Sequence, residues 1–147
     1  MKILKAAIKD KDEIAALFNE YRIFYGKESN RRDAALFIEE RLNNQDSTIF
    51  AVQQGEQFVG FVQLYPTFSS ISMKRAWILN DLFVIGEARK QGVAQMLLDQ
   101  AFELCKETNA LGLSLQTAPD NLNAQKLYEK NGFKRDEEFY TYSLMCE

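Results

Sequence analysis

Apolar residues recur with two different periods along the chain, and the changes of period separate helices from strands. A strand-like run covers residues 2–8, and apolar positions then follow every three or four residues up to Gly26 and again over residues 30–43, which predicts two helices. From Thr48 the apolar residues form short runs rich in Phe and Val, which predicts a hairpin of two strands over 48–52 and 58–65. Pro66 is expected to end the second strand.

The second half of the chain alternates between strand and helix patterns. Residues 77–85 are predicted as a strand, residues 86–90 as a polar loop, and helical spacing begins near Gln91. Alternating leucines indicate a strand from Leu111, a short helix is expected over 121–131, and a terminal aromatic strand over 139–145. The order β-α-α-β-β-β-α-β-α-β predicts an α/β fold with a mixed sheet, in one domain over residues 1–147.

The composition excludes several kinds of chemistry. The chain has no histidine, which removes Ser/His/Asp and Cys/His nucleophile arrangements and HExxH zinc sites. Its two cysteines, Cys105 and Cys146, cannot form a four-cysteine zinc site, so no metal is expected. A net charge of -3 disfavours a nucleic-acid partner, and no apolar run is long enough to predict a membrane span. The sparse cysteines and the absence of a leader-like start favour the reducing cytoplasm.

Residues 89–94, Arg-Lys-Gln-Gly-Val-Ala, connect a buried strand to an amphipathic helix. Gly92 allows a ligand to approach the backbone closely, and the first N–H groups of the helix have no partner within it. With Arg89 and Lys90, these groups predict a cradle for a pyrophosphate. The alternative is a solvated loop whose glycine only turns the chain. The spacing fits neither a P-loop nor a dinucleotide fingerprint.

A second motif, Asn-Leu-Asn-Ala-Gln-Lys-Leu-Tyr-Glu-Lys-Asn-Gly-Phe, occupies residues 121–133. Together with the preceding strand and R-x-x-G-x-A loop, it resembles the GCN5-related N-acetyltransferase (GNAT) superfamily, most strongly over residues 77–133. The resemblance implies a mostly antiparallel sheet, splayed between the 77–85 and 111–116 strands, with acetyl-CoA as co-substrate in the splay. The cofactor-binding residues that it implies, with the cradle, are Leu82, Phe83, Val84, Arg89, Lys90, Gln91, Gly92, Val93, Ala94, Gln95, Asn121 and Tyr128.

The resemblance also implies that Tyr128 stands near the CoA sulfur as general acid. This role suits its chemistry, because a tyrosine with an ordinary pKa near 10 is protonated at neutral pH. The alternative is a tyrosine that only packs its ring in the core. Asp81, beside Asn80 in the predicted strand, is the candidate for orienting the acceptor ammonium or relaying its proton through water. Asp81 could instead be a bulge residue that bonds the backbone.

The N-terminal half carries many aromatic residues that could cover an acceptor site. Segments 21–26, 63–66 and 79–84 resemble a subgroup that includes fungal histone/polyamine and D-amino-acid N-acetyltransferases. Aromatic faces and carboxylates together can hold a cation, although most of the rings could equally belong to the core. The candidate substrate-binding residues are Tyr25, Glu28, Tyr65, Trp77, Asn80 and Asp81.

These observations predict transfer of an acetyl group from acetyl-CoA to a primary amine of a small molecule, such as a polyamine or an amino acid. Acetylation of a protein lysine or N-terminus, and a non-catalytic CoA-binding module, are the alternatives. The acidic net charge disfavours a further alternative, an aminoacyl-tRNA acceptor. A homodimer is expected, because the apolar terminal strand would present an edge that is usually covered and because the family commonly dimerises.

Overall fold

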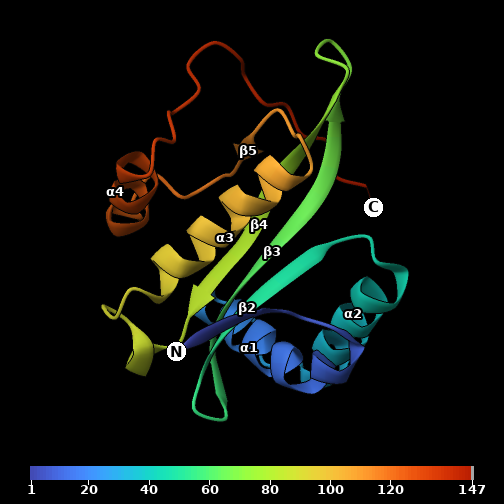
Figure 1. The fold of residues 1–147 in the computed structure, drawn as a ribbon, viewed down its shortest axis with the longest axis vertical. Coiled ribbons are helices and arrows are strands. Elements are labelled where there is room, and N and C mark those ends of the chain that lie inside the picture. The colour runs from blue at the N-terminus through green and yellow to red at the C-terminus, as the bar shows by residue number, and fades with distance from the viewer. Residues whose placement is uncertain (147) are drawn as a thin grey trace. The chain divides into compact units, whose positions relative to one another are not determined.

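The computed structural model describes residues 1–146, which divide into two compact units at Leu115 (Figure 1). The first unit contains a five-stranded sheet in the order β1-β2-β3-β4-β5, in which only the β4–β5 pair is parallel. The predicted α/β fold with a mixed, mostly antiparallel sheet is therefore confirmed. The elements of this unit are β1 Lys2–Lys5, α1 Lys11–Phe24, α2 Arg31–Asn44, β2 Thr48–Gln54, β3 Gln57–Ser69, β4 Lys74–Val84, α3 Val93–Glu107 and β5 Leu113–Ser114, with short 3-10 turns at Ile8–Asp10 and Gly86–Ala88.

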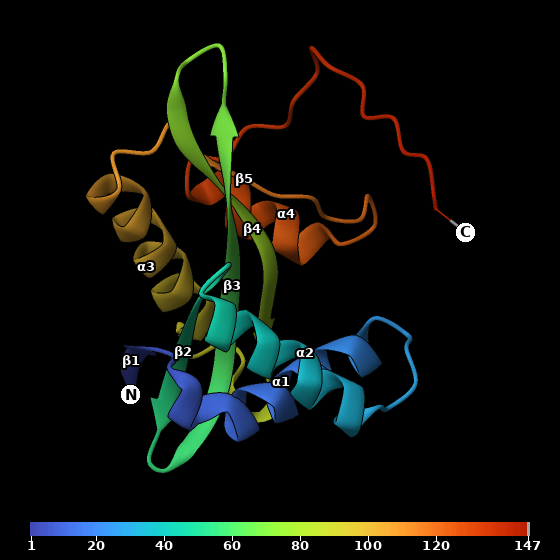
Figure 2. The same cartoon turned by 90° about the vertical axis from the view of Figure 1, so that its right-hand side faces the viewer.

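Helices cover both faces of the sheet in the first unit. Figure 2 shows α3 on one face and α1 with α2 on the other. Neighbouring residues of β3 demonstrate the two layers, because Phe61 lies 5.8 Å from the Tyr21 ring of α1 whereas the backbone of Gly60 lies under Val93 of α3. The alternation of side chains along a strand thus divides the core between the two helical layers.

A β-bulge at Asn80 reverses this alternation in β4. Gln63 of β3 pairs with Asp81, but the next residue, Leu64, pairs with Leu79, so Asn80 is the extra residue. Strict alternation would place Trp77 and Asp81 on the same face of β4. Instead the Trp77 indole donates a hydrogen bond to the hydroxyl of Thr108 beyond α3, at 2.9 Å, while Asp81 turns to the opposite face.

Pro66 does not end β3, contrary to the sequence-based expectation. It pairs with Trp77, whose N–H points away from β3 to the carbonyl of Gly112. The nitrogen of Pro66 therefore faces the opposite edge of β3, where pairing with β2 stops at Leu64. Proline is tolerated at such an edge because no ladder hydrogen bond is lost there.

The unit that begins at Gln116 contains one helix, α4 Leu122–Lys130, within its described residues. The helix was predicted, and the side chain of Asn121 caps it by accepting a hydrogen bond from the N–H of Ala124 at 3.3 Å. The predicted terminal strand over 139–145 is wrong, because these residues have no regular structure. An apolar run becomes a strand only when another strand pairs with it, and residues 116–146 contain none.

Gly60 fixes the distance between α3 and the sheet. A Cβ at this position would lie 2.9 Å from Cγ1 of Val93 and 3.0 Å from the carbonyl oxygen of Phe83. We expect Gly60→Ala to lower the free energy of unfolding by about 1 to 3 kcal/mol, because the clash involves backbone and a buried side chain. Gly112→Ala is the matched control, since nothing lies within 4 Å of a Cβ there. Equal denaturant midpoints for the two variants would contradict this packing.

Candidate active site

The backbone of β4 is paired along one edge and mostly open along the other. Towards β3 its pairing continues to Val84, whereas β5 pairs only with Trp77 and Ile78. Ile85 donates its N–H to Val59 of β3, so the alternation of an antiparallel ladder turns the N–H and C=O groups of Leu82 and Val84 towards the open edge. Within the described residues no strand pairs with this edge beyond Ile78, which gives an extended ligand a backbone to bond.

The loop that follows β4 leads directly into the N-terminus of α3. Lys90 and Gly92 both have left-handed backbone conformations, with φ of 62° and 84°. The first hydrogen bond of α3 runs from the N–H of Met96 to the carbonyl of Gly92, so the N–H groups of Val93 and Ala94 precede the helical ladder. The predicted loop thus forms a tight turn followed by a helix N-terminus, an arrangement that can bind phosphate groups, and its role as a pyrophosphate cradle stays a prediction.

Side chains tie this loop to the rest of the first unit. The Nε of Arg89 donates to the carbonyl of Val84 at 3.1 Å, and its guanidinium lies 5.1 Å from the Phe24 ring centre. Gln91 donates to the carbonyl of Glu87 at 3.1 Å. Arg89 is therefore held at the junction of the open β4 edge and the cradle, where a phosphate would meet its charge. Gln95, one turn into α3, donates to Asp99 at 2.8 Å.

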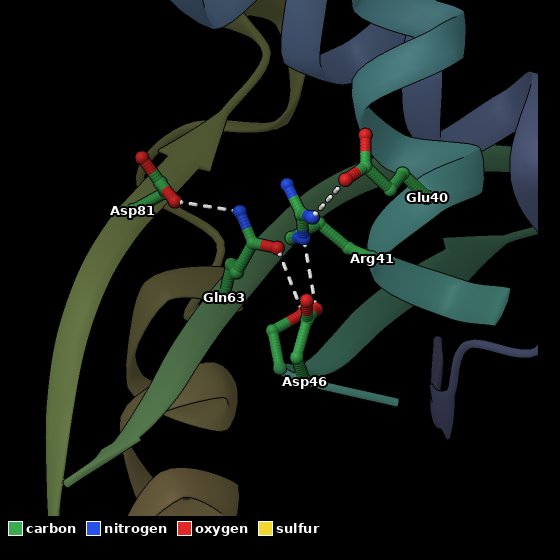
Figure 3. A network of polar contacts seen from close by, with 6 residues as sticks. Glu40, Arg41, Asp46, Gln63 and Asp81 are labelled. Atoms are coloured by element: carbon green, nitrogen blue, oxygen red, sulfur yellow. Dashed lines mark hydrogen bonds and ion pairs between the residues drawn. The ribbon is translucent and has the colours of Figure 1, made fainter. Parts of the chain in front are cut away.

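Asp81 is a buried carboxylate held by neutral amides (Figure 3). Its Oδ2 accepts a hydrogen bond from Nε2 of Gln63 at 2.8 Å, and its Oδ1 accepts one from Nδ2 of Asn80 at 3.2 Å. Ser47 completes the chain by donating to Oε1 of Gln63 at 3.0 Å. None of the ion pairs found in residues 1–146 includes Asp81, so its charge has no cationic partner there.

Charged and phenolic groups near Asp81 come from β3, from α2 and from the turn that follows α2. Burial, and then the carboxylate of Asp81, raise the pKa of Tyr65 to about 12, so its hydroxyl stays protonated at neutral pH. Arg41 is bound by Asp46 at 2.8 Å and by Glu40 at 3.0 Å. Figure 3 shows these pairs beside the polar chain of Gln63 and Asp81. Tyr65, Asn80 and Asp81, three of the predicted substrate residues, therefore lie in one region.

The other predicted substrate residues have different surroundings. Tyr25 is exposed at the end of α1, and its ring lies 5.0 Å from that of Tyr21, which in turn lies 6.0 Å from Phe83 of β4. Glu28 is exposed in the loop between α1 and α2, and its backbone carbonyl accepts a hydrogen bond from Arg22 at 3.3 Å. Trp77 is buried on the opposite face from Asp81, so its placement gives a substrate role no support.

Tyr128 and Asn121 belong to the second unit and are described within it. The Tyr128 ring is half-buried and makes an edge contact with Phe133, with ring centres 5.7 Å apart. The oxygen of the Asn121 side chain caps α4. The general-acid role of Tyr128 and the cofactor contact of Asn121 stay predictions.

Sequence reasoning missed Gln63 and Ser47. The signal for Gln63 is a polar residue between Phe61 and Tyr65, at an inward position of a strand that is otherwise apolar. Ser47 carries no comparable signal, because serine is common in the turn between a helix and a strand. Elsewhere in residues 1–146, no group of three His, Cys, Asp or Glu residues is arranged to hold a metal, and no helix is long and apolar enough to cross a membrane.

Comparison with known proteins shows the family. The model of the acetyltransferase (GNAT) family matches residues 14–133, and the chain therefore belongs to this family of acyltransferases. An uncharacterized N-acetyltransferase of Bacillus subtilis (strain 168), YhfO, is 45% identical over 98% of this chain and 97% of its own length. A crystal structure of a probable acetyltransferase is 44% identical, with a TM-score of 0.94 over 100% of this chain and 99% of the other.

A third relative has a named acceptor. The D-amino-acid N-acetyltransferase HPA3 of Saccharomyces cerevisiae is 28% identical over 95% of this chain and 89% of its own length. Enzymes of this family use acetyl-CoA as co-substrate, and the features of the first unit fit that molecule. The open edge of β4 suits the amide-containing pantetheine arm, and the loop from Arg89 to Ala94 suits the pyrophosphate.

The cradle makes a prediction about one glycine. Gly92→Ala strains the backbone by about 1 kcal/mol, because φ of 84° is unfavourable for a residue with a Cβ. Gly55→Ala imposes a similar strain at φ of 64° in the β2–β3 turn, and neither Cβ would meet another atom within 4 Å. We expect calorimetry to show CoA binding weakened about fivefold in Gly92→Ala and unchanged in Gly55→Ala. Unchanged binding by both variants would contradict the cradle.

Proposed function

We propose that the protein transfers the acetyl group of acetyl-CoA to the primary amine of a small molecule, with Asp81 binding the acceptor ammonium. The observation that carries this proposal is the placement of Asp81. It is a buried carboxylate without a cationic partner in residues 1–146. It lies on β4, and the edge of β4 that faces away from β3 is open for the co-substrate beyond Ile78. A buried anion of this kind attracts a cation more strongly than an exposed one does.

The first step of the reaction is deprotonation of the acceptor. An ammonium has no lone pair, so it must lose a proton to Asp81, directly or through water, before it can attack. The amine nitrogen then forms a bond to the thioester carbonyl carbon, and the carbon–sulfur bond breaks. The second nitrogen proton leaves as the amide forms. Because the chain has no histidine, a carboxylate or water must accept these protons.

Two donors assist the attack and the departure of the thiolate. A backbone N–H on the open edge of β4, such as that of Leu82 or Val84, can donate to the thioester oxygen as negative charge develops there. Tyr128 donates its hydroxyl proton to the CoA sulfur and regains one from water. Its place in the N-x-x-A-x-x-L-Y motif supports this assignment.

The surroundings of Asp81 support a cationic, compact acceptor. Tyr65 supplies a protonated hydroxyl, and the Tyr21 and Tyr25 rings supply aromatic faces on the same side of the sheet as Phe83. A polyamine or an amino acid fits this chemistry, and the resemblance to a D-amino-acid N-acetyltransferase favours the amino acid. We propose that the enzyme acts in the cytoplasm. We also propose a homodimer, since the apolar side chains of residues 139–145 are mostly exposed.

A panel of acceptors tests the proposed function. The assay measures CoA thiol release from acetyl-CoA with D- and L-amino acids, polyamines, aminoglycosides and a lysine peptide. Release above the hydrolysis blank with an amino acid or a polyamine would support the proposal. Turnover of the peptide alone would identify a protein acetyltransferase. Binding of CoA without turnover of any amine would identify a non-catalytic CoA-binding module.

Tyr128→Phe tests the general acid in the same assay. We expect kcat to fall about a hundredfold because the thiolate must leave without a proton donor, while the KM for acetyl-CoA changes little. Calorimetry of CoA binding to Tyr128→Phe is the control, since unchanged binding shows that the co-substrate site is intact. If kcat of Tyr128→Phe equals that of the wild type, Tyr128 is not the general acid.

A further inference from the structure

We propose that Gln63 is a positioning residue that holds the Asp81 carboxylate correctly oriented for the acceptor. The inference deepens the proposed function and rests on the role that this function gives Asp81. Gln63 lies on β3, directly opposite Asp81 in the register, and its side chain is fully buried. Figure 3 shows its amide nitrogen directed at Asp81 from the neighbouring strand.

Both ends of the Gln63 amide are used, which fixes its orientation. Its Nε2 donates to Oδ2 of Asp81 at 2.8 Å, and its Oε1 accepts from the hydroxyl of Ser47 at 3.0 Å. An ionised carboxylate can only accept hydrogen bonds, so the amide must present its nitrogen to Asp81.

Gln63 has this role because a stronger donor, the charged guanidinium of Arg41, is bound to other carboxylates. Arg41, a cation of α2 on this side of the sheet, is already bound by Asp46 and Glu40. The Tyr65 hydroxyl gives no hydrogen bond to Asp81 in the described structure. The hydrogen bonds described for Asp81 come from two amides, and the bond from Asn80 is the longer one at 3.2 Å.

The bulge explains why this arrangement suits catalysis. A cation bonded to Asp81 would compete with the acceptor ammonium for the same charge, whereas a neutral amide stabilises the carboxylate and leaves its charge uncompensated. Because the extra residue Asn80 turns Asp81 onto the face occupied by Gln63, the register and the hydrogen bond depend on each other. Ser47 holds the far end of the amide and so acts through Gln63.

Gln63→Met tests the proposal, because methionine has nearly the same length and shape but no donor. We expect the NMR signal of the Asp81 carboxyl carbon to move from its wild-type chemical shift at neutral pH, because the carboxylate loses the donor on Oδ2. Ser47→Ala keeps the donor and loosens only its anchor, so we expect a smaller change in the same direction. Asp99, an exposed carboxylate bonded by Gln95, provides the internal control in each spectrum.

The spectra need no substrate, so their failure is separate from failure of the proposed function. An Asp81 signal at the same chemical shift in the wild type and in both variants would overturn the role of Gln63. Kinetics then connect the two proposals. With an amine from the acceptor panel, we expect Gln63→Met to lower kcat/KM about tenfold in the wild-type background and to have no further effect with Asp81→Asn. An equal loss in both backgrounds would also overturn it, whereas full activity of Asp81→Asn alone would overturn the role of Asp81.

Discussion

The site depends on one constraint, the unequal pairing of β4. One edge of this strand is bonded to β3 as far as Val84, while β5 bonds the other edge only at Trp77 and Ile78. Backbone N–H and C=O groups within a protein need partners, and the remaining open edge must find them outside the sheet. A co-substrate with an extended, amide-containing arm can supply them. The α3 N-terminus follows this edge after a short loop. One bound co-substrate could therefore pair its extended arm with β4 and place its phosphates at α3.

The bulge in the same strand links the open edge to the proposed acceptor side. By turning Asp81 away from the α3 face, it gives β4 an acidic group on one face and an open backbone along one edge. The energetic consequence is considerable. Two opposite charges 4 Å apart attract by about 1 kcal/mol in water and by about 4 kcal/mol near a protein surface with an effective dielectric constant of about 20. A buried carboxylate held by amides can therefore select a cation that an exposed one would hold weakly.

Much of the fold follows from sequence patterns, and so does the position of the loop that we propose for phosphate binding. Helical spacing predicted α3 and the turn before it, because the apolar face of that helix packs against the sheet and its loop turns at Gly92. A bulge at Asp81 was one of two alternatives in the sequence, since a polar pair such as Asn80 and Asp81 is also compatible with simple alternation; the structure has the extra residue at Asn80. Pro66 was misread because its tolerance depends on which edge of β3 lacks a partner. The terminal aromatic run was also misread, because a strand exists only through its neighbour. The role of Gln63 could not be predicted from the sequence, because its hydrogen bond to Asp81 depends on the β3–β4 register, which pairs residues 18 positions apart.

Amide hydrogen exchange of β4 with and without CoA tests the central claim most directly. The N–H groups of Leu82 and Val84 face the open edge, whereas that of Phe83 faces β3 by the same alternation. If CoA binds along this edge, exchange at Leu82 or Val84 slows in its presence, and exchange at Phe83 changes much less. Unchanged exchange at both Leu82 and Val84 under saturating CoA would contradict the account.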